Sequence, residues 1–122
     1  MVIFLDTYAI VAIDTNQPSY RNYVLDSTDA ATTIFNLSET YFVYLKKFGQ
    51  KEADEIYEIV KILVVSIFED IIQEAMKFKL ANQKKRFSMA DCIGYITALK
   101  LNARFVTGDY SFKNLENVEF VK

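Results

Sequence analysis

Short apolar runs alternate with segments of helical periodicity along the chain, and no other feature constrains the fold as strongly. Residues 2–5 form a continuous apolar run, as in strands that are buried on both faces of a sheet. Ala53, Ile56 and Val60 instead recur at helical spacing. Because strands that are connected by helices usually run parallel, this pattern predicts an α/β protein with helices on both faces of its sheet.

The expected elements follow from these periods and from residues that cap helices. Strands are expected at residues 2–5, 31–35, 64–67, 104–107 and 118–121. Helices are expected at residues 8–13, 18–26, 39–48, 51–63, 69–81 and 89–101. Ser38 and Ser88 precede two of these helices as N-caps, and Gly49 ends one of them as a C-cap. We therefore expect a three-layer α/β/α sandwich with a mostly parallel central sheet of four to five strands.

Length and composition are those of one ordinary globular unit. The 122 residues suffice for one core, so we expect a single domain over residues 1–122. No apolar run approaches the ~18 residues that span a membrane, and no secretory signal is expected at the N-terminus. The one cysteine, Cys92, is expected to be a small buried core residue. Since it allows no internal disulfide, a reducing cytoplasm is the expected location.

Charge and the absence of histidine limit the chemistry. The net charge is −2 and the pI about 5.1, which argues against a protein that binds nucleic acid through bulk positive charge. A nuclease is still compatible, because a metal ion can supply positive charge locally. Without histidine, Ser-His-Asp and Cys-His catalysis are excluded, as is an imidazole-bound zinc site. Acid–base or metal chemistry must therefore use carboxylates, lysines, tyrosines or hydroxyls.

Four acids lie where a parallel sheet would place a ligand site. Asp6 follows the first expected strand, Glu39 opens the helix after the second, and Asp109 follows residues 104–107. Asp91 lies in the first turn of the helix before that strand. Ligands of such sheets bind beyond the carboxyl ends of the strands. Four clustered carboxylates repel one another, and Mg²⁺ or Mn²⁺ would relieve this and activate water for attack on a phosphodiester.

Each acid also has a purely local interpretation. Asp6 can cap the helix after the first strand, and Glu39 can interact favourably with a helix dipole. Asp91 and Ser88 form a sequence typical of a capping box, with Asp in the place of Glu. Asp109, in Thr-Gly-Asp, is a typical turn residue. The metal-site hypothesis therefore depends on the joint arrangement and not on any one acid.

Taken with their neighbours, the four acids resemble the motifs of PIN-domain nucleases, and especially of the small VapC-type toxins of prokaryotic toxin–antitoxin pairs. The segments that carry the resemblance, in chain order, are FLDTYAI, NLSETYF, SMADCIGYITALKL and RFVTGDYSF. Each motif is short, and their order and spacing over nearly the whole chain make the set specific. The family often has Ser or Asn two residues after its first Asp, where this chain has Tyr8.

The resemblance implies a single PIN-like domain and a metal-dependent endoribonuclease. Asp6, Glu39, Asp91 and Asp109 would ligate Mg²⁺ or Mn²⁺ and support RNA cleavage, with Glu39 holding a second metal or orienting the attacking water. Thr107 would lend a hydroxyl near the metal, and Thr7 would supply the hydroxyl that Tyr8 does not. A cognate antitoxin and a second copy of the chain are the implied protein partners.

Other surfaces and functions stay open at this stage. Lys84, Lys85 and Arg86 could contact RNA phosphates or form a solvated basic loop. The aromatic side of the helix at residues 39–48 could stack on bases, form a dimer surface or bind an antitoxin helix; its members are Tyr41, Phe42, Tyr44 and Leu45. The alternative function is a non-catalytic PIN-fold module that binds protein. A receiver-type phosphoryl-transfer protein fits less well, because no lysine follows a strand at the required place.

Overall fold

The computed structural model describes residues 2–122. Its strands are β1 (Ile3–Leu5), β2 (Ala30–Ala31), β3 (Arg104–Thr107) and β4 (Val118–Phe120). Its α-helices are α1 (Thr7–Asp14), α2 (Ile34–Lys47), α3 (Gln50–Val60), α4 (Glu69–Ala81) and α5 (Met89–Lys100). Short 3₁₀ turns are η1 (Pro18–Tyr20), η2 (Lys61–Leu63), η3 (Gln83–Lys85) and η4 (Tyr110–Phe112).

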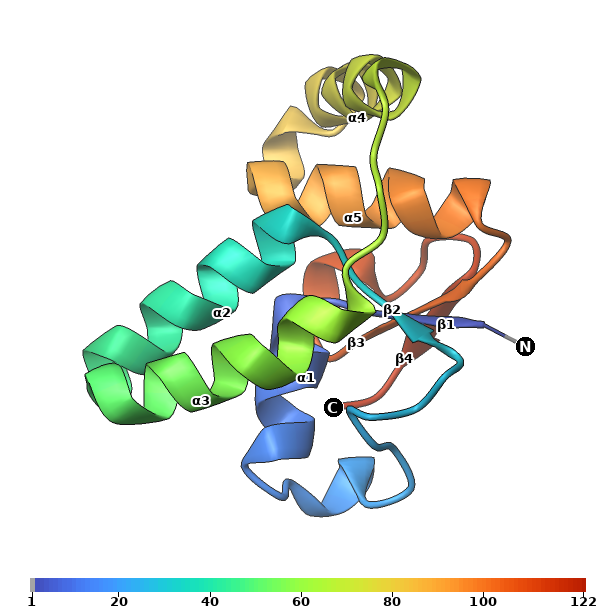
Figure 1. Cartoon of the computed structure of the whole chain (residues 1–122). Helices are drawn as coiled ribbons and strands as arrows, with labels where there is room; N and C mark the ends of the chain where they lie inside the picture. The colour runs from blue at the N-terminus through green and yellow to red at the C-terminus, as the bar shows by residue number, and fades with distance from the viewer. Residues whose placement is uncertain (1) are drawn as a thin grey trace.

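The strands form one sheet in the order β2-β1-β3-β4, and every neighbouring pair is parallel. Phe4 pairs with Ala31 on one side and with Phe105 on the other, so β1 and β3 are the central strands of the described sheet. Figure 1 shows α4 and α5 on one side of this sheet and α1 on the other, with α2 and α3 projecting as a pair. The carboxyl ends of β1 and β3 therefore lie side by side.

Alternation along the central strands divides the core into two layers. Phe4 and Phe105 belong to a buried cluster with α4 and α5, and their rings stack 5.5 Å apart. Leu5 and Val106, the next residue on each strand, belong to a second cluster with α1, α2 and α3. Since successive strand residues point to opposite faces, both faces of the sheet are covered. The predicted three-layer α/β/α sandwich with a parallel sheet is confirmed.

The second strand and the start of the following helix differ from the prediction. The strand ends at Ala31, and α2 begins at Ile34, within the segment 31–35 that was expected to be a strand. The N-cap is Thr33, whose Oγ1 accepts a hydrogen bond from Asn36 N at 3.2 Å. Ser38, the predicted cap, lies inside the helix and donates to Ile34 O. The β-branched run Thr32-Thr33-Ile34 has strand-like composition, but the threonine hydroxyl stops the strand and opens the helix.

Of two further expected elements, one is absent and one is shorter than predicted. Residues 64–67 form no strand, and Val64 makes only one isolated bridge, to Thr32. The chain at Thr32 leaves the sheet for α2, so no partner strand continues beside that segment. The helix expected at residues 18–26 is reduced to η1, because Tyr20 turns inward and its hydroxyl donates to Val121 O at 2.7 Å.

Helix α5 packs closely against β1 and α2 at Gly94. A Cβ atom at Gly94 would lie 3.0 Å from the ring of Phe4 and 3.1 Å from Oδ1 of Asn36. The missing side chain therefore lets α5 approach both β1 and α2. None of the helices in residues 2–122 combines the length and apolar composition that crossing a membrane requires.

Two alanine substitutions test which residue begins α2. Thr33→Ala removes a buried cap and should lower the free energy of unfolding by about 1–2 kcal/mol. Ser38→Ala removes only an exposed bond to a helix carbonyl and should change it by less than about 0.5 kcal/mol. Urea denaturation of both variants measures the difference. A larger loss for Ser38→Ala would show that the helix begins where the sequence pattern predicted.

Candidate active site

Three of the four predicted acids meet around one cavity at the carboxyl ends of β1 and β3. Asp6 follows β1, Asp109 follows β3 and Asp91 lies in the first turn of α5. Together they line a cavity of about 310 Å³ whose other lining residues are Thr7, Tyr8, Gly108, Tyr110 and Lys122. Glu39 does not line this cavity. The structure thus places a group of carboxylates where parallel sheets bind ligands.

Asp6 is the most buried of the acids and joins three elements. Its side chain is only 3% exposed. Oδ1 accepts a hydrogen bond from Ala9 N at 2.8 Å, which makes Asp6 the N-cap of α1. Oδ2 accepts a hydrogen bond from the hydroxyl of Thr107 on β3. The local capping interpretation is therefore correct, and it coexists with a place in the cavity.

Asp91 and Asp109 are also held by local hydrogen bonds. Asp91 Oδ2 accepts from Ser88 N at 2.8 Å, and Ser88 Oγ accepts from Asp91 N at 3.0 Å, which completes the predicted capping box. Asp109 Oδ1 accepts from Ser111 N at 2.9 Å and begins η4. The second oxygen of each carboxylate has no hydrogen-bond partner within residues 2–122. One oxygen thus fixes the side chain, and the other is left for a ligand.

Glu39 is outside the lining of the cavity and accepts hydrogen bonds from two hydroxyls. It is in the second turn of α2, because the helix starts at Ile34 and not at residue 39 as predicted. Oε1 accepts from Thr7 Oγ1 at 2.6 Å, and Oε2 accepts from Ser88 Oγ at 3.1 Å. Since Ser88 also forms the capping box with Asp91, Glu39 is connected to that acid through one hydroxyl, and through Thr7 it bonds to a residue that lines the cavity.

Threonine hydroxyls connect the acids, and a buried asparagine that the sequence pattern did not indicate bonds to one of these threonines. Thr107 Oγ1 donates to Asp6 and accepts from Asp109 N at 3.0 Å, so it links two of the acids. Buried Asn36 donates from Nδ2 to Thr7 Oγ1 at 3.2 Å. Its position three residues before Glu39, on the same face of a helix, is the signal that could have identified it.

The acids lie in a low-dielectric site in which each charge opposes the next. Burial raises the pKa of Asp6 from 3.8 to about 7, against the hydrogen bonds from Thr107 and Ala9, and the charges of Asp91 and Asp109 raise it further. Burial also raises the pKa of Asp91, with contributions from Glu39 and Asp109. Among residues 2–122, none of the four acids forms an ion pair. Carboxyl groups in a cavity whose pKa values are raised by burial and by neighbouring charges are typical of a functional site.

The donor set suits a hard divalent cation that keeps part of its water shell. The lining offers the carboxylates of Asp6, Asp91 and Asp109, and oxygen donors of this kind are the ligands that Mg²⁺ and Mn²⁺ prefer. In the part of the chain that the structure describes, no three acidic side chains approach closely enough to form a metal cage in advance. Mg²⁺ needs only one or two carboxylates besides water and substrate phosphate, so the residues fit such an ion.

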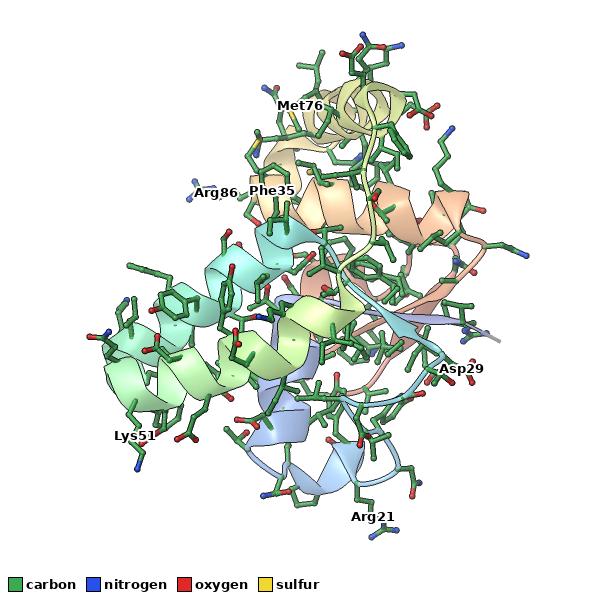
Figure 2. All side chains as sticks on the ribbon, in the orientation of Figure 1. Arg21, Asp29, Phe35, Lys51, Met76 and Arg86 are labelled. Carbon is green, nitrogen blue, oxygen red and sulfur yellow. The ribbon has the colours of Figure 1, made fainter. Side chains whose placement is uncertain are left out.

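The basic connection lies near the acids but not in the cavity. Lys84, Lys85 and Arg86 are exposed, and Figure 2 shows Arg86 projecting away from the ribbon before α5. Lys85 Nζ donates to Ser111 O at 3.0 Å, which ties this connection to η4. On the predicted aromatic side of α2, Phe42 is 60% exposed, whereas Tyr44 is buried and donates to Asp14. Tyr44 is therefore not available to a partner.

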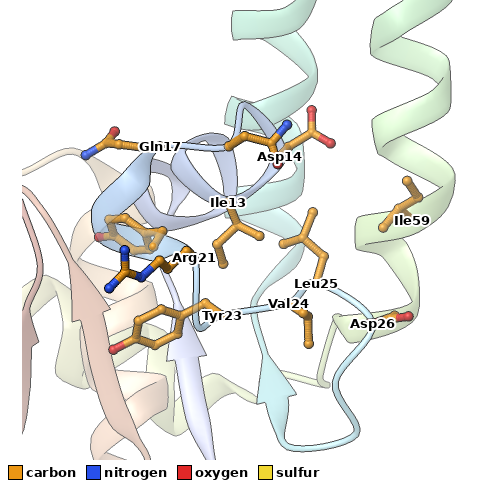
Figure 3. A pocket seen from close by; sticks show the side chains of 11 residues that line it. Ile13, Asp14, Gln17, Arg21, Tyr23, Val24, Leu25, Asp26 and Ile59 are labelled. Carbon is orange, nitrogen blue, oxygen red and sulfur yellow. The ribbon is translucent and has the colours of Figure 1, made fainter.

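A larger cavity of about 610 Å³ lies elsewhere, between the end of α1, the segment after η1 and α3. Figure 3 shows Ile13, Val24, Leu25 and Ile59 around it. Its two acids, Asp14 and Asp26, are not among the four predicted, and its walls are mainly apolar. The chemistry that the sequence predicts therefore belongs to the smaller cavity.

Local sequence patterns do not predict that Lys122 and Gly108 contact the ring of Tyr8. Lys122 Nζ lies 5.1 Å from the centre of the Tyr8 ring and 4.7 Å from that of Tyr110. A Cβ atom at Gly108 would lie 2.1 Å from a carbon of the Tyr8 ring, so only glycine allows Tyr8 to pack there. These contacts give Tyr8 a definite place against the loop that carries Asp109.

Removing the buried charge should change how stability depends on pH. Because the folded state raises the pKa of Asp6, it binds this proton more tightly than the unfolded chain does. This stabilisation is fully present below about pH 4 and is lost as the pH rises through about 7. Asp6→Asn keeps a good N-cap and lacks this titration. Without metal, the variant should gain on the order of 2–4 kcal/mol over wild type across that window.

Urea denaturation in a chelator at a series of pH values measures this effect. Parallel profiles of unfolding free energy for wild type and variant would contradict the raised pKa. Asp29→Asn serves as a control, because Asp29 is exposed and lies before β2, at the opposite end of the strands.

Comparisons with known proteins agree with this arrangement. A family model described as PIN domain matches residues 3–118. A comparison of the sequence with curated proteins finds no match. Among solved structures, a toxin–antitoxin complex from Klebsiella pneumoniae is similar at TM-score 0.72 and 13% identity, with 96% of this chain and 95% of that chain covered.

Two further solved structures have the same fold. VapC20 of Mycobacterium tuberculosis, a sarcin–ricin loop cleaving toxin, is similar at TM-score 0.72 and 15% identity, over 91% of each chain. VapBC2 of Rickettsia felis, bound to a DNA fragment from its promoter, is similar at TM-score 0.71 and 19% identity, over 98% of this chain and 97% of that chain. Since the family model spans nearly the whole sequence, the chain belongs to the PIN-domain family.

Proposed function

We propose that the protein is a metal-dependent endoribonuclease that cleaves RNA phosphodiester bonds with a metal-activated water. The observation that carries this proposal is the meeting of Asp6, Asp91 and Asp109 around one cavity in which, within residues 2–122, none of them forms an ion pair. A protein gains nothing in stability from buried carboxylates that repel one another. The cost is explained if they hold a cation and an anionic substrate.

The residues have distinct roles in this proposal. Asp6, Asp91 and Asp109 would hold Mg²⁺ or Mn²⁺, which when bound supplies a low-pKa water and stabilises charge on the leaving oxygen. Thr107 keeps the carboxylate of Asp6 oriented by donating to Oδ2. Glu39, held by the hydroxyls of Thr7 and Ser88, would orient the attacking water or contribute to a second metal.

We also propose that the protein is the toxin of a toxin–antitoxin pair. This is supported by the fold shared with a toxin–antitoxin complex, with the sarcin–ricin loop cleaving toxin VapC20 and with VapBC2. The partners would be a cognate antitoxin and a second copy of this chain. Exposed apolar side chains on α2 and α3 offer surface for such contacts; they are Phe42, Leu45, Tyr57 and Ile59.

Replacing Asp6 tests the nuclease directly. Asp6→Asn should lower the rate of RNA cleavage in Mg²⁺ or Mn²⁺ by at least about 100-fold, because it removes a charge that holds the metal. Cleavage of labelled RNA by the purified chain measures the rate, and circular dichroism checks the fold. Asp29→Asn, the same change on an exposed residue remote from the cavity, should cleave at the wild-type rate. Wild-type cleavage by Asp6→Asn would refute the proposed function.

Metal binding separates the nuclease from a non-catalytic interaction module of the same fold. Millimolar Mn²⁺ should raise the thermal unfolding midpoint of wild type and of Asp29→Asn, since a ligand that binds only the folded state stabilises it. At about 100 times the dissociation constant this amounts to about 2.7 kcal/mol. The midpoint of Asp6→Asn should respond much less. No response of wild type at millimolar Mn²⁺ would favour the module.

A further inference from the structure

Aromatic rings and lysines alternate along one rim of the carboxylate cavity. We call this set, made of Tyr8, Lys122, Tyr110, Lys113 and Phe120, the aromatic–lysine strip. Lys122 lies over the rings of Tyr8 and Tyr110, as described above. Lys113 Nζ lies 5.9 Å from the centre of the Tyr110 ring and 5.3 Å from the centre of the Phe120 ring. The Tyr110 and Phe120 rings are themselves 5.2 Å apart. Three members, Tyr8, Tyr110 and Lys122, also line the cavity.

The strip is anchored to the same backbone that positions the acids. Val121 N donates to Thr107 O at 2.8 Å, and Val121 O accepts from Tyr20 Oη at 2.7 Å. Both polar backbone groups next to Lys122 are therefore fixed. Phe120 lies on β4 and pairs in register with Thr107. A strip fixed in this way can bind a ligand at a defined distance from Asp6 and Asp109.

The two lysines are available to an anion. Within residues 2–122, neither Lys113 nor Lys122 forms an ion pair, although Lys122 lines a cavity with three carboxylates. The only hydrogen bond that Lys122 Nζ makes there is a long one of 3.4 Å to Gly108 O. The ring faces attract the ammonium groups and hold them in place, and the charges are not neutralised by this contact. The strip is thus a positive surface beside a negative cavity.

Ring faces beside phosphate-binding cations suit a single-stranded nucleic acid. Tyr110 is 62% exposed, so a base can stack on its ring while a neighbouring lysine contacts the backbone. Resting on the function proposed above, we infer that the aromatic–lysine strip binds single-stranded RNA and leads it to the cavity where Asp6, Asp91 and Asp109 lie. On a chain of net charge −2, a group of carboxylates repels a polyanion, and the positive charges of the strip reduce this repulsion near the cavity.

The test measures RNA binding apart from cleavage. In the Asp6→Asn background with a chelator present, fluorescence anisotropy follows the binding of a labelled, mixed-sequence single-stranded RNA. Tyr110→Ala should weaken binding about 5- to 150-fold, whereas Tyr110→Phe, which keeps the ring, should bind as the background does. Lys113→Gln with Lys122→Gln should reduce the slope of log affinity against log salt by about 1.4, since two phosphate contacts are lost. Circular dichroism confirms that each variant is folded.

The chain contains a matched control remote from the cavity. Lys46 Nζ lies 5.3 Å from the Phe42 ring on α2, which is the same kind of contact. Lys46→Gln, which removes this cation and leaves the Phe42 ring in place, should leave RNA affinity and salt slope unchanged. The inference is overturned if the background binds no RNA at tens of micromolar protein, if the strip variants bind as well as the background, or if Lys46→Gln loses as much affinity as they do. An antitoxin that binds through the strip while RNA affinity is unchanged is one such outcome.

The RNA-binding test and the cleavage test can fail independently of each other. If the background binds RNA through the strip but wild type does not cleave with Mg²⁺ or Mn²⁺, the nuclease proposal fails and the strip stands. If wild type cleaves while the strip variants bind RNA normally, the strip inference fails and the nuclease stands.

Discussion

The buried carboxylate of Asp6 is the constraint on which the rest of the site depends. It ends β1, caps α1 and accepts the hydroxyl of Thr107 on β3, so one side chain holds three elements in register. The same burial makes its ionised form costly, which raises its pKa to about 7. The fold is thus assembled around a group that opposes folding when charged. Such a cost is typical of residues that are kept for function and not for stability.

Helix capping and ligand binding are compatible here because they use different oxygens. In Asp91 and Asp109, one carboxylate oxygen accepts a backbone N–H and the other has no such bond within residues 2–122. The backbone bond fixes the side chain, so little conformational entropy is lost when the second oxygen binds a ligand. The local interpretation of these acids and the metal-site hypothesis are therefore two descriptions of one geometry, and neither excludes the other.

The sequence predicts the fold class and the central strands well, because the strand at 104–107 and the run that contains β1 are apolar and bounded by polar residues. The prediction is wrong where the composition of a segment favours a strand but a side-chain hydrogen bond begins a helix. Residues 31–35 have the β-branched composition of a strand, yet the hydroxyl of Thr33 starts a helix there. For this reason the sequence predicts Glu39 in the first turn of its helix, whereas it lies in the second turn of α2. There it still accepts hydrogen bonds from Thr7 and Ser88.

Contacts between distant parts of the chain lay beyond sequence reasoning. Asn36 reaches Thr7, and Lys122 reaches Tyr8 across more than a hundred residues, without any periodic pattern that would pair them. The net charge of −2 was equally uninformative, because it averages over an acidic cavity and a basic rim. For a polyanionic ligand the local arrangement of charge matters more than the net charge. The backbone bond between Val121 and Thr107 holds the aromatic–lysine strip beside the carboxylates, so Lys122 offsets part of their repulsion toward an anion at this place.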